Sequence, residues 1–501
     1  MAPSTNGTAK LGLRDLVEDI LIIILVESNV PGVLALSRTN KYLRRIALTR
    51  AVWYSLVSRL VQRGFIDSRP DDGYFKDLST EQLIGLVRRM LHGPKAWTDT
   101  PSQSQSFPNP RSQTAVRRAV NRFRKFIRKP PLGGLASAPL VESRRIVLHH
   151  PEIDTAPGGL PEWHVNRPKL LPGGKYVLFR NSGRVECWSV FEDRHIWTHT
   201  PSMDHTLVHN FEVDMLEDDV AIISTCQLTG PQPKPFVEIT SLNLQTGVSD
   251  LELVSRLPEL PEHDFRFVDC VVCGDVVAVH LRPENQVLLI NWRTSSRVVV
   301  SGYKSETALV PGYLVVLTRT GTRGEHRVAL SPFASFACWE PNDSVEQPSA
   351  PVVPVADLPF LPGTISLTCE LYYTWKRSIW VYESPFQRGR FTFWLHALVN
   401  STPALLSYEF LKHDTGVSWR FVASTPMPDH IYPTAVSLSG HTLGHCTDYA
   451  GYGIIAPFPV SKGSARRHIV DFGIPSIHHL PPFSGALTHL TLTELTVVYY
   501  D

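Results

Sequence analysis

Cysteine and histidine side chains stand at two places where their spacing could hold a metal ion. Cys270 and Cys273 have the spacing of half a zinc site, but neither a second such pair nor a spaced histidine pair follows. Because both lie within an apolar β run, their thiols are expected to point to opposite faces of a strand. The second group, His441-Thr-Leu-Gly-His445-Cys446, lies among Ser and Gly residues that favour a loop. Both groups indicate structural roles, and no metal is expected.

The motifs that identify several enzyme classes are absent from the sequence. It contains neither the Gly-x-Ser-x-Gly elbow of hydrolases nor the GxxxxGK[ST] loop that binds phosphates. No residue is therefore nominated as catalytic, no cofactor is expected, and the chain is predicted to be a non-catalytic protein.

Length and composition limit the kinds of protein that this chain can be. At 501 residues it exceeds the size at which one hydrophobic core stops growing, so two or more domains are expected. A formal charge of +2, with 43% hydrophobic and 19% charged residues, excludes a mostly disordered chain and a general polyelectrolyte. Neither nucleic acid nor a membrane is therefore the expected partner, although a local basic patch stays open.

The chain carries no recognisable signal for a membrane or for secretion. Its longest aliphatic run, at 20–26, is seven residues long, whereas a spanning helix needs about twenty. The first ten residues lack the apolar run and cleavage site of a secretory signal. Seven dispersed cysteines suit reduced thiols. These features predict a protein of the cytoplasm, the nucleus or both.

Up to about residue 129 the hydrophobic period is that of helices. Three short helices are expected first, marked by Ile20 and Ile24 with Leu21 and Leu25 on the adjoining face, by Pro31 early in the second, and by Val52, Leu56 and Leu60 in the third. A fourth follows, because Ser79 and Gln82 have the S-x-x-Q spacing of a capping box.

Two unusual segments separate these helices from the rest of the chain. Residues 98–115 are rich in Ser, Pro, Gln and Thr, which predicts a linker. Residues 116–130 place apolar side chains on one helical face and many Arg and Lys side chains elsewhere. This basic amphipathic segment could be a helix packed on the next domain, a nuclear-import or nucleic-acid patch, or a membrane-surface helix.

From about residue 170 onward the pattern changes to short β runs separated by Gly, Pro and Asn/Asp clusters. Four segments combine a hydrophobic strand, a polar turn and a second strand, and they begin near Val177, Val220, Val276 and Leu314. These spacings of 43, 56 and 38 residues are close to the roughly 40 to 50 residues of a β-propeller blade. The region 140–501 therefore predicts a propeller of about seven blades.

The stretch from Leu13 to Leu56 resembles the F-box. The matching residues are Leu16-Val17-Glu18-Asp19-Ile20-Leu21, Ile24-Leu25, Pro31, Val33-Leu34, Leu36, Lys41-Tyr42-Leu43 and Trp53. Val17, Ser28 and Asn40 stand where the family usually has proline, an aliphatic residue and cysteine. The strand ends at 187–190 and 290–293, with Trp188 and Trp292, resemble divergent WD-repeat blades. Together these parts are similar to the expanded F-box protein family of mushroom-forming (basidiomycete) fungi.

The predicted fold class is therefore multidomain, α and then all-β. The expected parts are a disordered N-terminus at 1–10, a three-helix F-box at 11–63, a helical extension at 64–97, the linker at 98–115, the basic segment at 116–130 and the propeller-like domain at 140–501.

The resemblance implies a substrate receptor of an SCF-type cullin-RING E3 ubiquitin ligase. The F-box would bind a Skp-type adaptor, which joins it to the cullin-RING scaffold, and the propeller would bind an unidentified protein substrate. The residues expected to bind the adaptor are Leu13, Leu16, Val17, Ile20, Leu21, Ile24, Pro31, Val33, Leu34, Leu36, Leu43 and Trp53.

Two other functions stay open from the sequence. The chain could be a non-catalytic propeller scaffold whose F-box-like helices have no ligase role. It could also be a propeller hydrolase or lectin, which would need a channel lined by carboxylates or by a metal.

Overall fold

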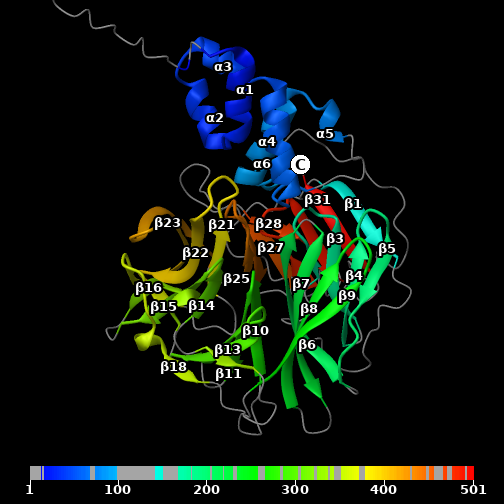
Figure 1. The fold of residues 1–501 in the computed structure, drawn as a ribbon, viewed down its shortest axis with the longest axis vertical. Helices are drawn as coiled ribbons and strands as arrows, with labels where there is room; N and C mark the ends of the chain where they lie inside the picture. The colour runs from blue at the N-terminus through cyan, green and yellow to red at the C-terminus, as the bar shows by residue number, and fades with distance from the viewer. Residues whose placement is uncertain are drawn as a thin grey trace, which may run out of the picture.

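A computed structural model describes most of the helical part and the strands of the β region (Figure 1). The described residues are 13, 16–67, 74–98, 142–149, 168–181, 183–203, 206–217, 219–229, 234–257, 266–282, 286–302, 306–320, 324–336, 339–342, 351–371, 378–428, 431–446, 451–455, 467–470, 477–490 and 494–500. The predicted N-terminal segment 1–10, the basic segment 116–130 and, apart from Thr98, the linker 98–115 lie outside these residues.

Within the described residues, seven α-helices occupy the first hundred positions. They are α1 (Glu18–Glu27), α2 (Val30–Ser37), α3 (Lys41–Ala47), α4 (Arg50–Gln62), α5 (Tyr74–Asp77), α6 (Thr80–His92) and α7 (Lys95–Thr98). The region predicted to hold three helices thus holds four, and the additional one is α3. This seven-residue helix begins where the Asn40 side chain accepts a hydrogen bond from the Leu43 N–H at 2.8 Å.

The start of α6 confirms the predicted capping box. The Ser79 hydroxyl accepts a hydrogen bond from the Gln82 N–H at 3.3 Å, and the Gln82 side chain accepts one from the Ser79 N–H at 2.7 Å. Two backbone donors of the first turn are thereby satisfied.

The β region forms seven sheets, which confirms the predicted α-then-all-β architecture with a seven-bladed propeller. The first sheet contains β2 (Lys169–Leu170), β3 (Tyr176–Asn181), β4 (Arg184–Ser189) and β5 (Arg194–Thr198), and the second contains β6 (Thr206–Glu217), β7 (Val220–Thr229), β8 (Lys234–Asn243) and β9 (Ser249–Arg256). The third sheet contains β10 (Arg266–Cys273), β11 (Val276–Arg282), β12 (Gln286–Asn291) and β13 (Ser296–Ser301), with β17 (Glu340–Pro341) and β18 (Val352–Pro354) beside β13.

The remaining four sheets complete the ring. The fourth sheet contains β14 (Glu306–Val310), β15 (Tyr313–Arg319), β16 (Glu325–Pro332) and β19 (Ile365–Thr368), and the fifth contains β20 (Glu370–Leu371), β21 (Ile379–Glu383), β22 (Arg390–Val399), β23 (Thr402–His413) and β24 (Gly416–Pro426). The sixth sheet contains β25 (Ile431–Val436), β26 (Thr442–Cys446), β27 (Gly451–Ile455) and β28 (Arg467–Val470). The seventh contains β29 (Ile477–His479), β30 (Ala486–Leu490), β31 (Leu495–Tyr500) and β1 (Glu142–Leu148).

The last sheet joins the two ends of the propeller. Its outer strand β1 comes from the start of the domain and pairs antiparallel with β31 from Glu142↔Tyr500 to Leu148↔Leu495. Figure 1 shows this as the cyan β1 beside the red β31. The pairing closes the ring of blades, so the closing strand is non-local in sequence.

Apolar side chains fill every junction between neighbouring blades. In β7, Ile222 packs with residues of the third sheet, whereas its neighbours Ala221 and Ile223 pack with residues of the first. Because successive side chains of a strand point to opposite faces, one strand serves both junctions. The four predicted strand–turn–strand segments are the central hairpins of their blades, β3–β4, β7–β8, β11–β12 and β15–β16.

The loop expected at 441–446 is largely a strand instead, since β26 covers Thr442–Cys446. Gly444 explains the misleading pattern, because a Cβ there would lie 2.2 Å from Cγ2 of Ile431 on the paired strand. The glycine permits close packing of two strands rather than a turn.

Candidate protein-binding surface

Exposed apolar side chains gather on the first helices of the chain. Fourteen large hydrophobic side chains are exposed among the described residues, and eight of them lie between positions 13 and 48. We call this group the apolar surface: Leu13, Val17, Ile20, Ile23, Ile24, Leu34, Tyr42 and Leu48. Val17 and Ile23 are the most open, at 66% and 58% exposure. Such a concentration of exposed apolar residues is typical of a protein–protein contact site.

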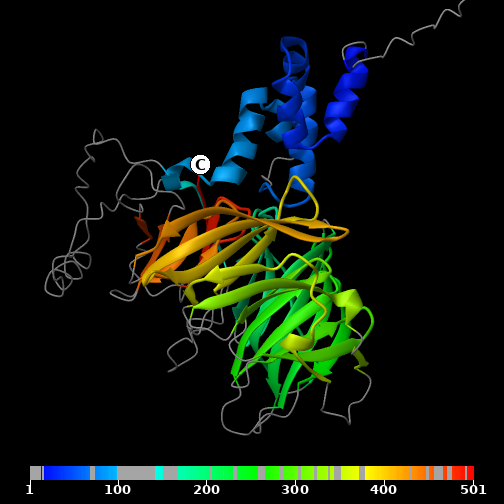
Figure 2. The ribbon, with the colours of Figure 1, turned by 90° about the vertical axis from the view of Figure 1, so that its left-hand side faces the viewer.

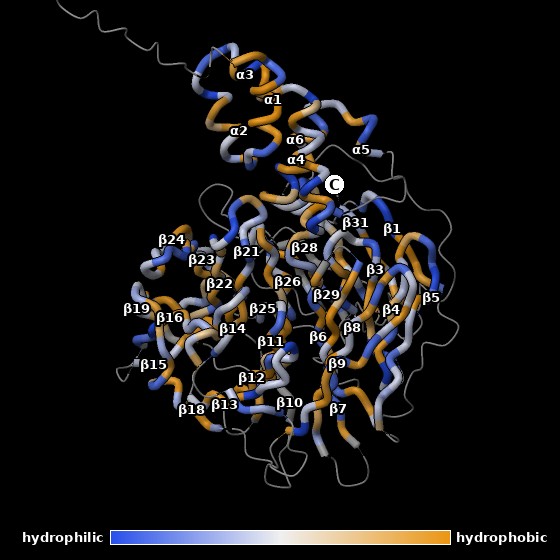
Figure 3. The backbone as a smooth tube through the Cα atoms, viewed as in Figure 1, coloured by the Kyte–Doolittle hydropathy of each residue, from blue (hydrophilic) through white to orange (hydrophobic). Residues whose placement is uncertain are grey.

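The composition of α1 explains this surface. The helix reads EDILIIILVE, so aliphatic residues surround it on all sides, and Figure 3 shows hydrophobic colour along α1 and α2. Only Leu21 and Leu25, one turn apart, are buried against the other helices. A helix that is apolar all round is expected to be buried on all sides, but no element among the described residues covers the exposed side of α1.

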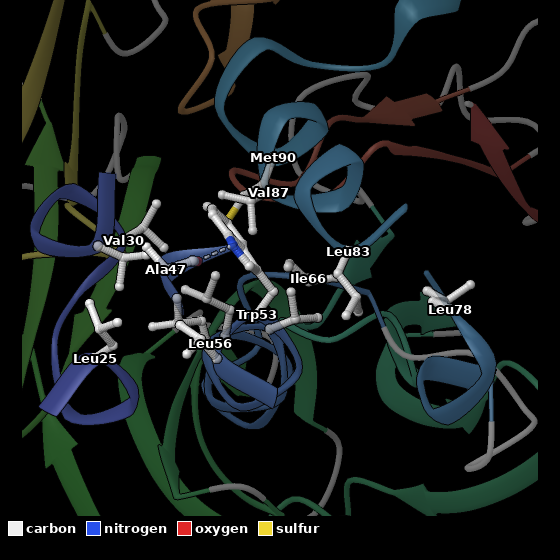
Figure 4. Close-up of a cluster of buried hydrophobic side chains, with 14 of the residues drawn as sticks. Leu25, Val30, Ala47, Trp53, Leu56, Ile66, Leu78, Leu83, Val87 and Met90 are labelled. Atoms are coloured by element: carbon white, nitrogen blue, oxygen red, sulfur yellow. Dashed lines mark hydrogen bonds between the residues drawn. The ribbon is translucent and has the colours of Figure 1, made fainter. Parts of the chain in front are cut away.

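The core beneath the surface is held by Trp53 on α4 (Figure 4). Its side chain is 1% exposed, and its indole N–H donates a hydrogen bond to the Ala47 carbonyl at 2.9 Å. The same core contains Leu25 from α1, Leu56 from α4 and Val87 from α6. This core fixes the relative positions of the helices that present the apolar surface.

Two asparagines and a serine define the ends of these helices. The Asn29 side chain accepts a hydrogen bond from the Gly32 N–H at 2.8 Å and so caps α2, as Asn40 caps α3. At the end of α1, the Ser28 hydroxyl donates to the Ile24 carbonyl at 2.7 Å. Ser28 and Asn40, two of the departures from the usual F-box residues, therefore have capping roles here. Val17 precedes α1 without a capping side chain.

The twelve residues predicted to bind an adaptor divide into three groups. Exposed are Leu13, Val17, Ile20, Ile24, Pro31 and Leu34; partly buried are Leu16 and Leu36; buried in the helical core are Leu21, Val33, Leu43 and Trp53. The side chains of these four buried residues belong to the helical core, so they hold the exposed residues in position and are not themselves exposed to a partner. Ile23, Tyr42 and Leu48 also belong to the exposed set, but the sequence does not predict them as adaptor-binding residues.

Basic side chains border the apolar surface. Arg38, Lys41, Arg44 and Arg45 are all exposed on α3 or just before it. Arg45 forms an ion pair with Glu18 at 2.9 Å and lies over the Tyr42 ring. Cations beside an apolar face favour a partner whose own contact surface is apolar with acidic residues around it.

The opposite end of the helical domain contacts the propeller. Figures 1 and 2 place α1–α3 away from the blades, while the end of α4 and α7 reach them. The Gly173 N–H donates to the Gly64 carbonyl at 3.0 Å, and the Arg63 guanidinium donates to the Pro385 carbonyl at 2.8 Å. Gly64 has φ 73°, and a Cβ there would lie 2.5 Å from Pro172. The apolar surface therefore takes no part in this junction.

Trp97 on α7 is a fully buried contact between the two parts. Its side chain is fully buried between the sixth and seventh blades, with ring centroids 5.1 Å from His441 and 5.7 Å from Tyr500. The helical extension thus ends in an aromatic side chain inserted into the propeller core, which attaches the last helix to the domain.

A buried polar network occupies the second blade. The Glu238 carboxylate lies 3.0 Å from His199 and accepts hydrogen bonds from Gln227 at 2.6 Å and from the Ser202 N–H at 2.9 Å. Burial by itself raises the pKa of Glu238, but the hydrogen bonds from His199, Ser202 and Gln227 outweigh it and lower the pKa. This network anchors the connection after β5 to β8, which is a structural role.

The cysteines have the environments of structural residues. Cys270 packs between the second and third blades and Cys273 packs on the other side, toward the fourth, so their thiols do not converge. Burial raises the pKa of Cys187 to about 12 and of Cys369 to about 11, so neither is a ready thiolate nucleophile. Among the described residues no group of three His, Cys, Asp or Glu could hold a metal ion. In the same residues, no helix is both long and apolar enough to cross a membrane.

No protein-family model and no curated protein matches the chain. Solved structures similar to it include the WD40 domain of SCAP from fission yeast, at 11% identity and TM-score 0.36, over 67% of this chain and 84% of that one. Another similar structure is an oligogalacturonate lyase in complex with manganese, at 9% identity and TM-score 0.34. This match covers 67% of this chain and 76% of the lyase chain. With identities and TM-scores this low, the likenesses carry no argument, and the propeller assignment depends on the strand topology.

Proposed function

We propose that the chain is the substrate-receptor subunit of an SCF-type cullin-RING E3 ubiquitin ligase, acting as a non-catalytic adaptor in the cytoplasm or nucleus. The apolar surface on α1–α3 supports this proposal. It lies on the segment that resembles the F-box, and the junction with the propeller does not cover it.

In this proposal the apolar surface binds a Skp-type adaptor protein. Each aliphatic side chain that becomes fully buried contributes about 1.5–3 kcal/mol before the cost of association. Several such side chains can therefore sustain a stable complex. The propeller holds the protein substrate, and the junction fixes the substrate relative to the adaptor.

A scaffold without a ligase role is the second candidate, and the docking of the helices on the propeller favours it. Trp97 and Arg63 show that part of the helical domain serves packing within the chain. The apolar surface then binds some other protein, or a second copy of the chain, and no cullin is recruited.

Co-purification with a Skp-type adaptor and a cullin-RING scaffold tests the proposal. The double substitution Ile20→Glu with Ile23→Glu is expected to weaken adaptor binding at least about a hundredfold, because two anchors of the surface become charged. Val248→Glu is the matched control, since Val248 is 62% exposed on the propeller.

Two results would reject the receptor. One is failure of the unmodified chain to bind the adaptor. The other is adaptor binding that the double substitution leaves at the level of Val248→Glu. Adaptor binding without recruitment of the cullin would favour the scaffold.

A further inference from the structure

The outer strand of the fifth blade, β24, carries an exposed aromatic side chain. Six large hydrophobic side chains are exposed among the described residues of the propeller, and Phe421, at 55%, is the one aromatic side chain of the six. Val422, which follows it in the chain, is 43% exposed. β24 is the last strand of its sheet, and Figure 3 shows it beside β23 at the margin of the propeller. The apolar surface takes no part in this edge, and the edge does not depend on a ligase role.

Aromatic side chains form two rows across the last three strands of the blade. Each row takes one residue from β22, one from β23 and one from β24: Phe391, Phe410 and Trp419 in the first row, and Phe393, Tyr408 and Phe421 in the second. Neighbouring ring centroids within a row are 4.6–6.2 Å apart. The rings on β22 and β23 are buried, whereas Trp419 is partly buried and Phe421 is exposed. Both rows therefore stop at an edge where apolar side chains of a further strand would continue them.

The backbone on the outer side of β24 is also available for pairing. The Val417 N–H points away from β23, because it donates to the Pro362 carbonyl at 2.9 Å. Alternate residues of an antiparallel strand direct their N–H and C=O groups to the same side. Since the register with β23 is regular from Val417 to Phe421, the backbone groups of Trp419 and Phe421 also point outward. Among the described residues, no strand pairs with this side of β24.

A row of charges crosses the other face of the same strands. Arg420 stands between Trp419 and Phe421, so its side chain points to the face opposite the aromatic rows. This side chain is 67% exposed, and its guanidinium donates to Glu409 on β23, which also accepts from Arg390 on β22. Two guanidinium groups thus share one carboxylate oxygen. An acidic side chain opposite Arg420 on a further strand would continue the alternation of charge across the sheet.

The open part of the edge is short. The register with β23 shifts at Val422, which forms a β-bulge and ends the regular strand edge on one side. On the other side, Pro362 already pairs with Val417. The stretch 419–421 between them is the part of the edge that a partner strand can reach.

We propose that this edge of β24 binds an extended segment of another protein in which an acidic residue stands between two aromatic or large aliphatic residues. The main chain of the segment adds to the fifth blade as an outer strand. Its acidic side chain pairs with Arg420, and its two apolar side chains pack beside Trp419 and Phe421. Main-chain hydrogen bonds supply affinity in this mode of recognition, and the alternating side chains supply specificity.

Saturation-transfer difference NMR of the full chain with the peptide acetyl-TTFEFTT-amide tests the proposal. The comparison peptide acetyl-TTFKFTT-amide has lysine in place of the central glutamate. The glutamate peptide is expected to give a saturable signal at low-millimolar concentration, and the lysine peptide is expected to bind at least about threefold more weakly. Absence of saturable binding by the glutamate peptide, or equal affinities of the two peptides, would overturn the proposal.

Exchange of one charge on β24 should reverse the preference. In the variant Arg420→Glu, the lysine peptide is expected to bind more tightly than the glutamate peptide, because the cross-strand pair is restored with opposite signs. Arg420 is exposed, so the fold should be retained. A variant that still prefers the glutamate peptide would contradict the pairing with Arg420.

Exposed apolar residues on two outer strands provide a matched pair of variants. Phe421→Ser removes the exposed end of the second aromatic row and should weaken binding of the glutamate peptide about threefold or more. Leu251→Ser changes a residue that is 52% exposed on β9, the outer strand of the second blade, and should leave the affinity unchanged. Equal affinities of these two variants would place the peptide elsewhere on the chain.

Discussion

Phe65 of the helical domain and Phe483 of the seventh blade meet edge to face, with ring centroids 4.7 Å apart and planes at 89°. Beside this pair, the Ser484 hydroxyl donates to Asp67 at 2.6 Å. Aromatic packing and a partly buried hydrogen bond thus join segments from the two ends of the chain. The helical domain is therefore attached to the propeller by specific contacts in addition to the connecting chain.

Removal of the Trp97 side chain should destabilise the propeller. Trp97→Ala leaves a cavity between the sixth and seventh blades, where the native side chain is fully buried. Truncations of buried aromatic residues cost about 3–5 kcal/mol. Urea denaturation followed by tryptophan fluorescence measures the loss. Lys95→Ala, an exposed position on the same short helix, should change stability by less than about 0.5 kcal/mol. An equal effect of both substitutions would mean that Trp97 does not support the blades.

The cap at Asn40 should stabilise the helical domain. Asn40→Ala removes the acceptor of the Leu43 N–H, and the free energy of unfolding should fall by about 1 kcal/mol. Asn40→Asp keeps an acceptor at the same position and should restore most of the loss. Thermal unfolding by circular dichroism checks the order of the three proteins. Equal stability of the Ala and Asp variants would contradict a capping role.

The elements that the sequence predicts correctly are those coded by local chemistry. Ser79 and Gln82 are three residues apart, so their capping box depends on one helical turn. The hairpin strands beginning at Val220 and Val276 are short apolar runs bounded by polar turns.

The features that sequence reasoning missed depend on distant contacts. Trp97 enters a junction formed by residues beyond 430, and nothing near Trp97 in the sequence indicates that environment. On α1, Ile20 and Leu21 are equally apolar, so hydrophobic periodicity does not tell which one faces the core. The structure buries Leu21 and exposes Ile20.

Acidification below about pH 6.5 should destabilise the propeller through its buried histidines. Burial lowers the pKa of His478 to about 3 and of His489 to about 4, against about 6.5 in an unfolded chain. Well above pH 6.5, both histidines are neutral in the folded chain and in the unfolded chain. Below it the unfolded chain binds protons that the folded chain does not, so the free energy of unfolding falls.

Urea denaturation at pH 7.5 and pH 5 measures this loss, which should approach about 1 kcal/mol per pH unit for each histidine. Asp67 acts in the opposite direction, because its folded pKa of about 6 is raised and the folded chain gains a proton as the pH falls. The stabilities at the two pH values are therefore compared in a protein that carries the substitution Asp67→Asn. His478→Gln with His489→Gln should make the pH dependence shallower, and an unchanged slope would contradict the prediction.

The apolar surface should make the isolated chain self-associate. Val17, Ile20 and Ile23 are exposed without a covering element among the described residues, and contact between two copies would remove them from water. Ile20→Glu with Ile23→Glu should therefore reduce self-association, measured by sedimentation velocity over a range of concentrations. Because both side chains are exposed, thermal stability should stay close to that of the unmodified protein.

A substitution at Leu25, on the buried side of α1, distinguishes this surface from the core. Leu25 is 1% exposed, so Leu25→Glu places a carboxylate in the helical core and should unfold the domain. The double Glu variant adds two negative charges and Leu25→Glu adds one, and the substituted side chains face opposite sides of α1. If the double Glu variant also loses its helical signal, Ile20 and Ile23 belong to the core and the surface is not available to a partner. If it stays folded yet associates like the unmodified chain, the contact lies elsewhere.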